Sequence, residues 1–280
     1  MKVVITGAGG QLGLEMIAVF RAAEIEVCGY PREVLDITDE QQVRTVFFRE
    51  RPNVIIHCAA YTHVDDAEKN AARAFLVNEM GTRYIAKAAE ALQAKLVYMS
   101  TDFVFNGKLT RPLVEEDKPD PQNVYGQSKL AGEVMVHACH SRFFIVRTSW
   151  LFGRFGSNFV KTMLRTMRTE QTLHVVTDQI GSPSYTLDVA EMVLRLVKTE
   201  YYGVYHLSNH GACTKYAFCE EMFKNIRGNV VIRACTKTQW PIVTVRPAYT
   251  AFAHEALRKR GFPKMRSWQA ALQHFLAEEM

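Results

Sequence analysis

The chain lacks several features that would narrow its function at once. Its six cysteines form no C-x-x-C pair, and no group of cysteines and histidines has the spacing of a zinc site. Lysine and arginine form no basic run although the net charge is +5, which argues against a nucleic-acid partner. No apolar run approaches membrane-spanning length, and the first residues are typical of a strand rather than of a signal peptide. We therefore expect a cytoplasmic protein with reduced cysteines and without nucleic-acid or membrane partners.

The first 150 residues alternate short apolar segments with amphipathic ones. The apolar segments predict strands over 2–6, 26–29, 54–60, 95–100 and 143–147. The amphipathic segments predict helices over 12–23, 40–51 and 71–92, followed by a helix that contains Tyr125. Apolar strands that alternate with helices are typical of α/β proteins with a parallel, doubly wound sheet.

The alternation is less regular in the second half. Helices are predicted over 158–168, 187–198, 215–223 and 268–277, and strands over 173–176 and 202–207. No linker rich in glycine, proline or serine separates this part from the first. We therefore expect residues 151–280 to form a smaller, interleaved α/β lobe, some of whose segments return to the first domain.

A glycine-rich loop joins the first strand to the first helix. Gly7, Gly10 and Gly13 have the spacing G-x-x-G-x-x-G. Glycines at such positions allow a tight turn, let backbone N–H groups reach a pyrophosphate and let the helix pack closely on the sheet. The loop predicts a Rossmann-like dinucleotide-binding domain over residues 1–150, with Gly7, Gly10, Gln11 and Leu12 at the cofactor.

The segment after the second strand bears on the choice of cofactor. Arg32 is available for a 2′-phosphate and favours NADP(H), whereas Glu33 or Asp36 could bind the ribose hydroxyl of NAD(H). Asp36 and Ile37 lie where the chain can approach the adenine. Three further residues that follow the third strand are predicted to contact the cofactor: Ala59, Ala60 and Tyr61.

Tyr125 and Lys129 form the only Tyr-x-x-x-Lys spacing in the chain. On a helix this spacing places both side chains on one face, about 5–6 Å apart at Cβ. An ammonium beside a phenol favours the phenolate and lowers the tyrosine pKa toward neutrality, where the pair can donate and accept a proton. An exposed helix contact is the alternative. Downstream of a nucleotide-binding loop, the pair indicates a hydride-transfer enzyme.

The residues together resemble a known family, the dTDP-4-dehydrorhamnose reductases of the extended short-chain dehydrogenases/reductases. The resemblance covers nearly the whole chain, in order. Its motifs lie at residues 10–13, 57–62, 64–65, 67–68, 100–105, 123–133, 147–150, 158–163, 178–183 and 246–247.

The resemblance implies a catalytic set of Thr101, Tyr125 and Lys129. Tyr125 would donate a proton to the C4 carbonyl oxygen of dTDP-4-dehydro-L-rhamnose while a nicotinamide delivers hydride, giving dTDP-L-rhamnose. Thr101 would hydrogen-bond that oxygen, and Lys129 would hold the nicotinamide ribose. Asp102 and Trp150 match positions that contact the sugar nucleotide, although Trp150 could instead be a packed core aromatic.

Several alternatives stay open at this stage. The chain could be a 4-ketoreductase of another deoxysugar nucleotide, or a non-catalytic, cofactor-binding regulatory subunit of the methionine adenosyltransferase type. Asn158 and Arg246 are further substrate candidates or simply polar contacts, and residues 112–121 are either a lid or a solvated connection. Some relatives form magnesium-bridged dimers. Because only Glu15 matches their metal positions, we expect no metal and either a monomer or a homodimer.

Overall fold

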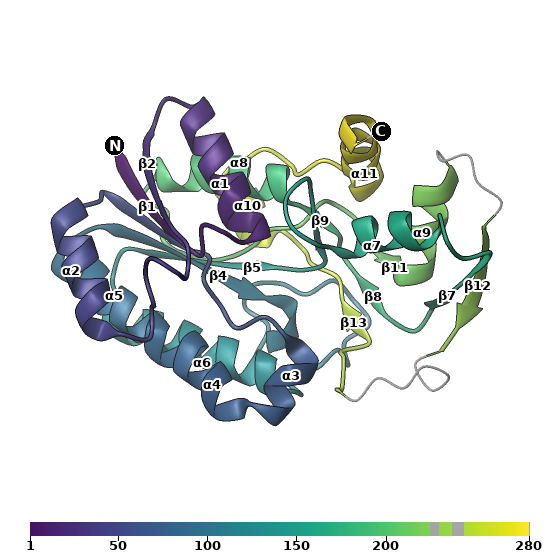
Figure 1. Ribbon diagram of the computed structural model, residues 1–280, viewed down its shortest axis with the longest axis horizontal. Coiled ribbons are helices and arrows are strands. Elements are labelled where there is room, and N and C mark those ends of the chain that lie inside the picture. The colour runs from purple at the N-terminus through teal and green to yellow at the C-terminus, as the bar shows by residue number, and fades with distance from the viewer. Residues whose placement is uncertain (225–229, 237–243, 280) are drawn as a thin grey trace.

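A six-stranded, fully parallel sheet forms the centre of the computed structural model, which describes residues 1–224, 230–236 and 244–279. The strand order is β10-β5-β4-β3-β1-β2, so the chain starts inside the sheet and builds outward in both directions (Figure 1). The strands are β1 (Lys2–Thr6), β2 (Glu26–Tyr30), β3 (Val54–His57), β4 (Lys95–Thr101), β5 (Phe143–Thr148) and β10 (Gly203–His206). The predicted doubly wound parallel sheet is confirmed.

Helices cover both faces of the sheet because its strands are apolar on both sides. In β1, Val3 and Ile5 pack with helices on one face, while Val4 packs with helices on the other. The first face is covered by α1 (Gln11–Ala22) and α8 (Thr186–Val197). The second is covered by α2 (Glu40–Glu50), α5 (Thr82–Ala91) and α6 (Val124–Cys139). Figure 1 shows these two layers above and below the strands.

The long helix predicted over 71–92 has an irregular middle. It consists of α4 (Ala71–Phe75), a π-helical turn over Leu76–Gly81 and α5, and the short α3 (Val64–Lys69) precedes it. The buried side chain of Asn78 lies inside the π-helical turn. Such turns are frequent at functional sites, and this one faces the cavity described below.

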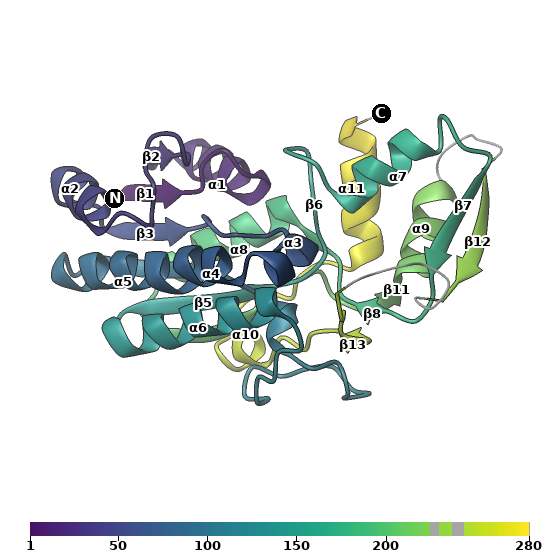
Figure 2. The same cartoon turned by 60° about the horizontal axis from the view of Figure 1, so that its bottom comes forward.

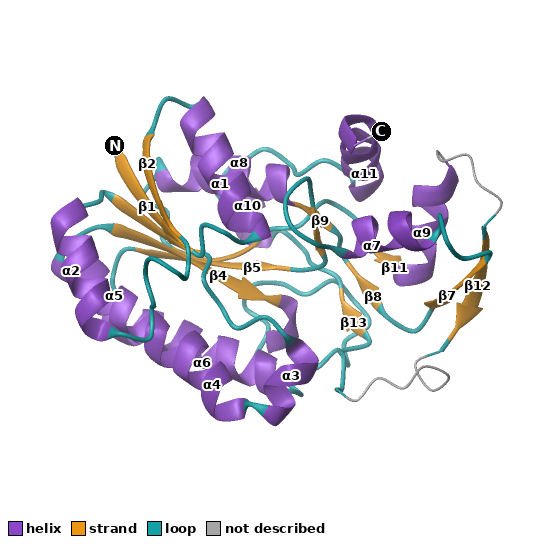
Figure 3. Ribbon diagram, in the orientation of Figure 1, coloured by secondary structure: helices purple, strands orange, loops and turns teal. Residues whose placement is uncertain are grey.

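In its described residues, the lobe consists of short strands and three helices around an aromatic core. Its strand pairs are β6 with β9, β8 with β11 and β13, and β7 with β12 (Figure 3). The core includes Phe152, Tyr185, Phe218 and Phe275. The strands are β6 (Leu151–Phe152), β7 (Thr172–Val176), β8 (Ile180–Gly181), β9 (Ser184–Tyr185), β11 (Cys213–Thr214), β12 (Val231–Cys235) and β13 (Tyr249–Thr250). The helices are α7 (Phe159–Thr166), α9 (Lys215–Lys224) and α11 (Trp268–Glu279).

The chain passes between sheet and lobe more than once. After β9 it returns to the sheet to form α8 and β10, and later to form α10 (Glu255–Lys259), whose Leu257 packs in the sheet core. The strand arrows of β1 and β3 in Figure 2 point toward the lobe. The carboxyl ends of the parallel strands, where ligands of such sheets bind, therefore face the lobe. In the described ranges, no helix combines the length and apolar character that a membrane crossing requires.

Candidate active site

A cavity of about 890 Å³ lies between the carboxyl edge of the sheet and the lobe. The catalytic set, the predicted cofactor residues, Asp102, Trp150 and the substrate candidate Arg246 line it, whereas the other substrate candidate, Asn158, does not. The structure therefore brings together residues that are up to 239 positions apart, from Gly7 to Arg246. This volume is in the range of cavities that enclose small-molecule ligands.

The glycine loop is built for a close backbone approach. Gly7 has a φ of +66°, and the Gly10 N–H donates to the Gly7 carbonyl at 3.0 Å. A Cβ at Gly13 would lie 2.2 Å from the Gly7 carbonyl oxygen, and a Cβ at Gly7 would lie 2.5 Å from the Ala59 backbone nitrogen. Gly10 caps α1 without a side-chain hydrogen bond. The backbone N–H groups of the first helical turn are thus available to an anion, as a dinucleotide site requires.

The turn after β2 carries Arg32, Asp36 and Ile37 to the same cavity. One oxygen of the Asp36 carboxylate accepts hydrogen bonds from the backbone and hydroxyl of Thr38, at 2.9 and 2.7 Å, and these bonds hold the Asp36 pKa below its usual value. The charges of Arg73 and Arg32 lower that pKa further. Arg73, on α4, also lines the cavity. The sequence analysis missed it, because no motif marks an arginine whose place depends on the packing of α4.

The loop after β3 is held in place from the π-helical turn. Asn78 accepts a hydrogen bond from the Tyr61 N–H at 2.8 Å, and its amide donates to the Tyr61 carbonyl at 3.1 Å and to Ser128 at 2.9 Å. Asn78 therefore connects the loop of Ala59 and Ala60 to the helix that carries Tyr125. These contacts fix the spacing between two walls of the cavity.

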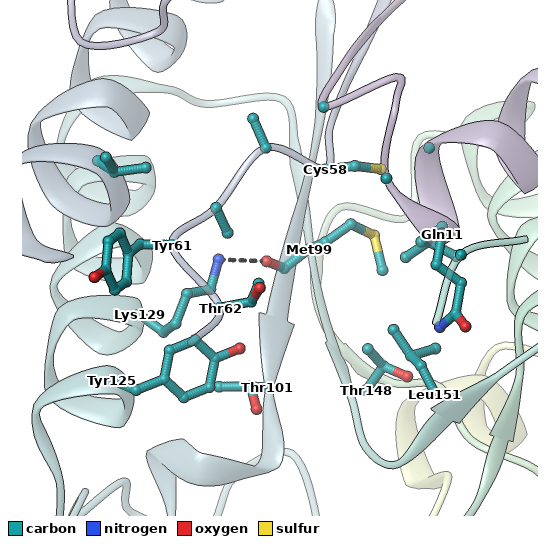
Figure 4. A pocket seen from close by; sticks show the side chains of 18 of the residues that line it. Gln11, Cys58, Tyr61, Thr62, Met99, Thr101, Tyr125, Lys129, Thr148 and Leu151 are labelled. Atoms are coloured by element: carbon teal, nitrogen blue, oxygen red, sulfur yellow. Dashed lines mark hydrogen bonds between the residues drawn. The ribbon is translucent and has the colours of Figure 1, made fainter. Parts of the chain in front are cut away.

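Thr101, Tyr125 and Lys129 meet at the end of β4. Thr101 is the last residue of β4, while Tyr125 and Lys129 lie on α6. The Lys129 ammonium donates to the Met99 carbonyl at 2.6 Å (Figure 4). The same ammonium lies 4.1 Å from the centre of the Tyr98 ring. The Tyr125 phenol lies beside the Thr101 side chain, whose hydroxyl donates to the Asp102 carboxylate at 3.1 Å. The three polar groups thus face one another inside the cavity.

The pKa values at this centre differ from the sequence-based expectation. Burial raises the pKa of Tyr125 to about 12, and the neighbouring Thr101 side chain only partly offsets this rise. Burial lowers the pKa of Lys129 to about 7. The expectation that Lys129 would bring the Tyr125 pKa toward neutrality is therefore wrong in this structure: desolvation dominates, and the ammonium is directed to the Met99 carbonyl.

Asp102 and Trp150 line the side of the cavity nearest the lobe. The buried Asp102 carboxylate accepts hydrogen bonds from Thr101 at 3.1 Å and Thr250 at 2.7 Å, and burial raises its pKa to about 6. Trp150 has a φ of +46°, which is unusual for a residue with a side chain. Its indole packs so closely on Gly181 that a Cβ there would lie 2.6 Å from the ring. Trp150 is thus both packed and part of the cavity wall.

The lobe adds further cavity residues that the sequence did not single out, among them Gln179 and Lys215. Gln179 lies within the resembling segment 178–183, which was a usable signal. Lys215 belongs to no motif. Its one signal is position, because it opens α9 and a positive charge is unfavourable at a helix N-terminus.

The remaining candidates have structural partners. Asn158 caps α7 by accepting from the Lys161 N–H at 3.0 Å, and it donates to Gln11 at 2.8 Å. Arg246 pairs with Asp65 at 3.1 Å. In the loop over 112–121, Glu115 accepts from the His206 N–H at 3.1 Å, which anchors that segment to β10.

Glu15, the one residue at a possible metal position, is fully buried. It pairs with Arg154 at 2.9 Å and accepts a hydrogen bond from Thr186 at 2.9 Å. Within the described part of the chain, no three histidine, cysteine, aspartate or glutamate side chains are grouped so that they could hold a metal ion.

Comparison with known proteins gives consistent matches over the full length. The family model "RmlD substrate binding domain" matches residues 1–280. The Bacillus subtilis "Spore coat polysaccharide biosynthesis protein SpsK" is 41% identical, over 99% of this chain and 97% of that protein. A Streptomyces niveus "dTDP-4-keto-6-deoxy-D-glucose reductase" is 36% identical, over 96% of this chain and 94% of that protein. The crystal structure of dTDP-4-dehydrorhamnose reductase from Bacillus anthracis in complex with NADP is 42% identical with a TM-score of 0.97, over 99% of both chains.

Proposed function

Because this chain belongs to the dTDP-4-dehydrorhamnose reductases of the extended short-chain dehydrogenase/reductase family, we propose that it reduces dTDP-4-dehydro-L-rhamnose to dTDP-L-rhamnose with NADPH. The observation that carries this proposal is the meeting of Tyr125, Thr101 and Lys129 in the cavity that the glycine loop also lines. A dinucleotide on that loop and a ketone at that centre would share one enclosed space.

In the proposed reaction, Tyr125 donates the proton and Thr101 orients the carbonyl. A pKa of about 12 keeps Tyr125 protonated at neutral pH, which suits a proton donor in the direction of reduction. Thr101 would hydrogen-bond the C4 carbonyl oxygen, so that charge developing on that oxygen meets fixed donors. Lys129 would hold the nicotinamide ribose from its position beside the Met99 carbonyl. The dinucleotide, when bound, supplies the hydride.

NADP(H) is the proposed cofactor, and NAD(H) is the alternative. Arg32 and Arg73 line the cavity beyond β2 and both act on the charge of Asp36, so they could share a 2′-phosphate. One oxygen of the Asp36 carboxylate is already engaged by Thr38, which makes it less available to a ribose hydroxyl. The open glycine loop fits the pyrophosphate of either cofactor.

We further propose that residues 1–150 mainly bind the dinucleotide and that residues 151–280 mainly bind the sugar nucleotide. The second assignment is supported by Gln179, Lys215 and Arg246, which line the cavity beyond the Tyr125 centre. The catalytic role of Tyr125 and the cofactor roles of Gly7, Gly10, Gln11 and Leu12 belong to the same proposal.

The proposal is tested by incubating the purified protein with dTDP-4-dehydro-L-rhamnose and either NADPH or NADH. We expect oxidation of NADPH and formation of dTDP-L-rhamnose, with slower turnover of NADH. The reverse assay, dTDP-L-rhamnose with NADP⁺, uses a stable substrate and should reduce the cofactor. Absence of turnover with both cofactors in both directions would refute the proposal.

A related 4-ketoreductase activity is the second candidate, favoured by the similarity to the Streptomyces niveus dTDP-4-keto-6-deoxy-D-glucose reductase. The two candidates share the Tyr125 centre and differ in the configuration of the sugar. Turnover of dTDP-4-keto-6-deoxy-D-glucose in the same assay distinguishes them, because a higher kcat/KM for that sugar would make this second reading the correct one.

A further inference from the structure

Lys215 places an unpaired positive charge in the lobe wall of the cavity. It is the first residue of α9, and its ammonium lies 3.6 Å above the Trp150 ring and 4.6 Å from the centre of the Phe159 ring. Among the residues that the structure describes, none accepts a hydrogen bond from this ammonium or forms an ion pair with it. The ammonium therefore contacts aromatic faces, which attract a cation weakly compared with a paired carboxylate, and the charge of Asp102 acts on it without a hydrogen bond or ion pair.

This position is an unfavourable one for a cation. The N-terminus of a helix carries partial positive charge, which repels an ammonium. Burial lowers the pKa of Lys215 to about 8, and the negative charge of Asp102 only partly opposes this shift. The other titratable or charged groups that act on Lys215 are Cys213, Cys219 and Arg246. A bound anion would relieve the repulsion, so the arrangement is suited to a negatively charged ligand.

Arg246 is the second cation at this end of the cavity, and its donors are only partly used. Its guanidinium pairs with Asp65 at 3.1 Å, but its Nε–H is buried and has no acceptor within the described ranges. An unmet buried donor costs free energy unless a ligand supplies the acceptor. Lys215 and Arg246 thus both lack an anionic partner on the cavity side.

We propose that Lys215, supported by Arg246, binds the diphosphate of the sugar nucleotide. The inference rests on the proposed function. If C4 of the sugar lies at Tyr125 and Thr101, the diphosphate on C1 lies across the ring, away from the reaction centre. The glycine loop is needed for the diphosphate of the cofactor, so the second diphosphate requires cations elsewhere. Lys215 and Arg246 are the cations on the lobe side of the cavity lining.

The test is direct binding of dTDP and thymidine to the NADP⁺-loaded protein by titration calorimetry, compared among wild type, Lys215→Met, Lys215→Arg and Lys224→Met. Loss of one charge-assisted contact should weaken dTDP binding about tenfold to hundredfold in Lys215→Met. Lys215→Arg keeps the charge and should restore most of the affinity. Lys224→Met is the matched control, because Lys224 is an exposed lysine at the other end of α9 and pairs with Glu221.

The outcomes separate this inference from the proposed function. If the wild type does not bind dTDP, the proposed substrate class is wrong. Two results with a wild type that binds dTDP would show that the diphosphate role is wrong and that Lys215 only supports Trp150. In the first, Lys215→Met binds dTDP as well as the wild type does. In the second, Lys215→Met loses affinity for dTDP and for thymidine to the same extent.

A second measurement covers the case in which Lys215→Met fails to fold, as judged by loss of NADP⁺ binding. Arg246→Gln should then weaken dTDP binding several-fold while leaving NADP⁺ binding unchanged. In the wild type, dTDP affinity should fall with added salt more steeply than thymidine affinity. Equal salt dependence, or unchanged dTDP binding in Arg246→Gln, would overturn the inference.

Discussion

The two walls of the cavity are built in different ways. The sheet wall uses short consecutive segments that follow β1, β2, β3 and β4. The lobe wall uses residues from segments that are distant in the chain, among them Trp150, Gln179, Lys215 and Arg246. A wall made of local turns leaves motifs in the sequence, whereas a wall assembled by packing does not. Because each wall should bind a different ligand, mutations in one wall should change the binding of the cofactor and mutations in the other the binding of the sugar nucleotide.

The largest effect is expected at Tyr125, where the walls meet. Tyr125→Phe removes the phenol hydroxyl but keeps the ring that packs against Phe103. We expect kcat to fall about 10²- to 10⁴-fold, because the proton donor is lost, while the Kd of NADP⁺ stays unchanged. Steady-state kinetics and calorimetry measure the two quantities. Tyr201→Phe, at an exposed tyrosine, is the control. A fall in kcat of less than tenfold would contradict the donor role.

The next effect should be confined to the sheet wall. In Gly13→Ala, the new methyl group would lie 2.2 Å from the Gly7 carbonyl oxygen, so the loop must shift. Such overpacking costs about 1–3 kcal/mol, and we expect a lower melting temperature and a higher KM for NADPH.

Gly9→Ala is the matched control for this loop variant, because its methyl group would only contact Pro31 at 3.5 Å. If Gly13→Ala raised the KM for the sugar nucleotide as strongly as that for NADPH, the two walls would not be functionally separate.

The corresponding change in the lobe wall is Gly181→Ala. Its methyl group would lie 2.6 Å from the Trp150 indole, which must then move into the cavity. We expect the KM for the sugar nucleotide to rise several-fold, up to about tenfold, because the added methyl group overpacks this part of the wall. The KM for NADPH should not change. The reverse pattern in steady-state kinetics would show that Trp150 belongs to the cofactor side.

The smallest expected effect is a pH dependence of kcat/KM for NADPH. The pKa of Lys129 is about 7, so its charged form is lost as the pH rises through 7. If that charge holds the cofactor, kcat/KM for NADPH should fall above pH 7, by less than tenfold between pH 7 and 8. Tyr125, with a pKa of about 12, stays protonated over this range. A value that rises above pH 7 would contradict the role of Lys129.

The sequence predicted most of the sheet and its helices but few of the small strands in the lobe. Strands β1, β3, β4 and β5 are apolar on both sides, which gives a strong signal. In contrast, β6, β8, β9, β11 and β13 have two residues each. Two residues show no periodicity, so only their partners in space define them as strands.

The cofactor wall was likewise more predictable than the lobe wall. Its candidates, from Gly7 to Tyr61, could be named from motifs, while Arg73, Gln179 and Lys215 were missed. The role of Asn78 in holding the Tyr61 loop is visible only in its hydrogen bonds. Such residues depend on how helices pack, which one sequence does not specify.

The sequence by itself determined the order of strands and helices, the glycine loop and the spacing of Tyr125 and Lys129, because these depend on local geometry and periodicity. Only the tertiary structure decided the electrostatics of that pair and the composition of the opposite wall. Burial is the main cause of both pKa shifts, upward for Tyr125 and downward for Lys129. The lobe wall depends on contacts between residues such as Trp150 and Lys215, which are far apart in the chain. Helical spacing brings side chains together, but the surrounding fold sets their charge.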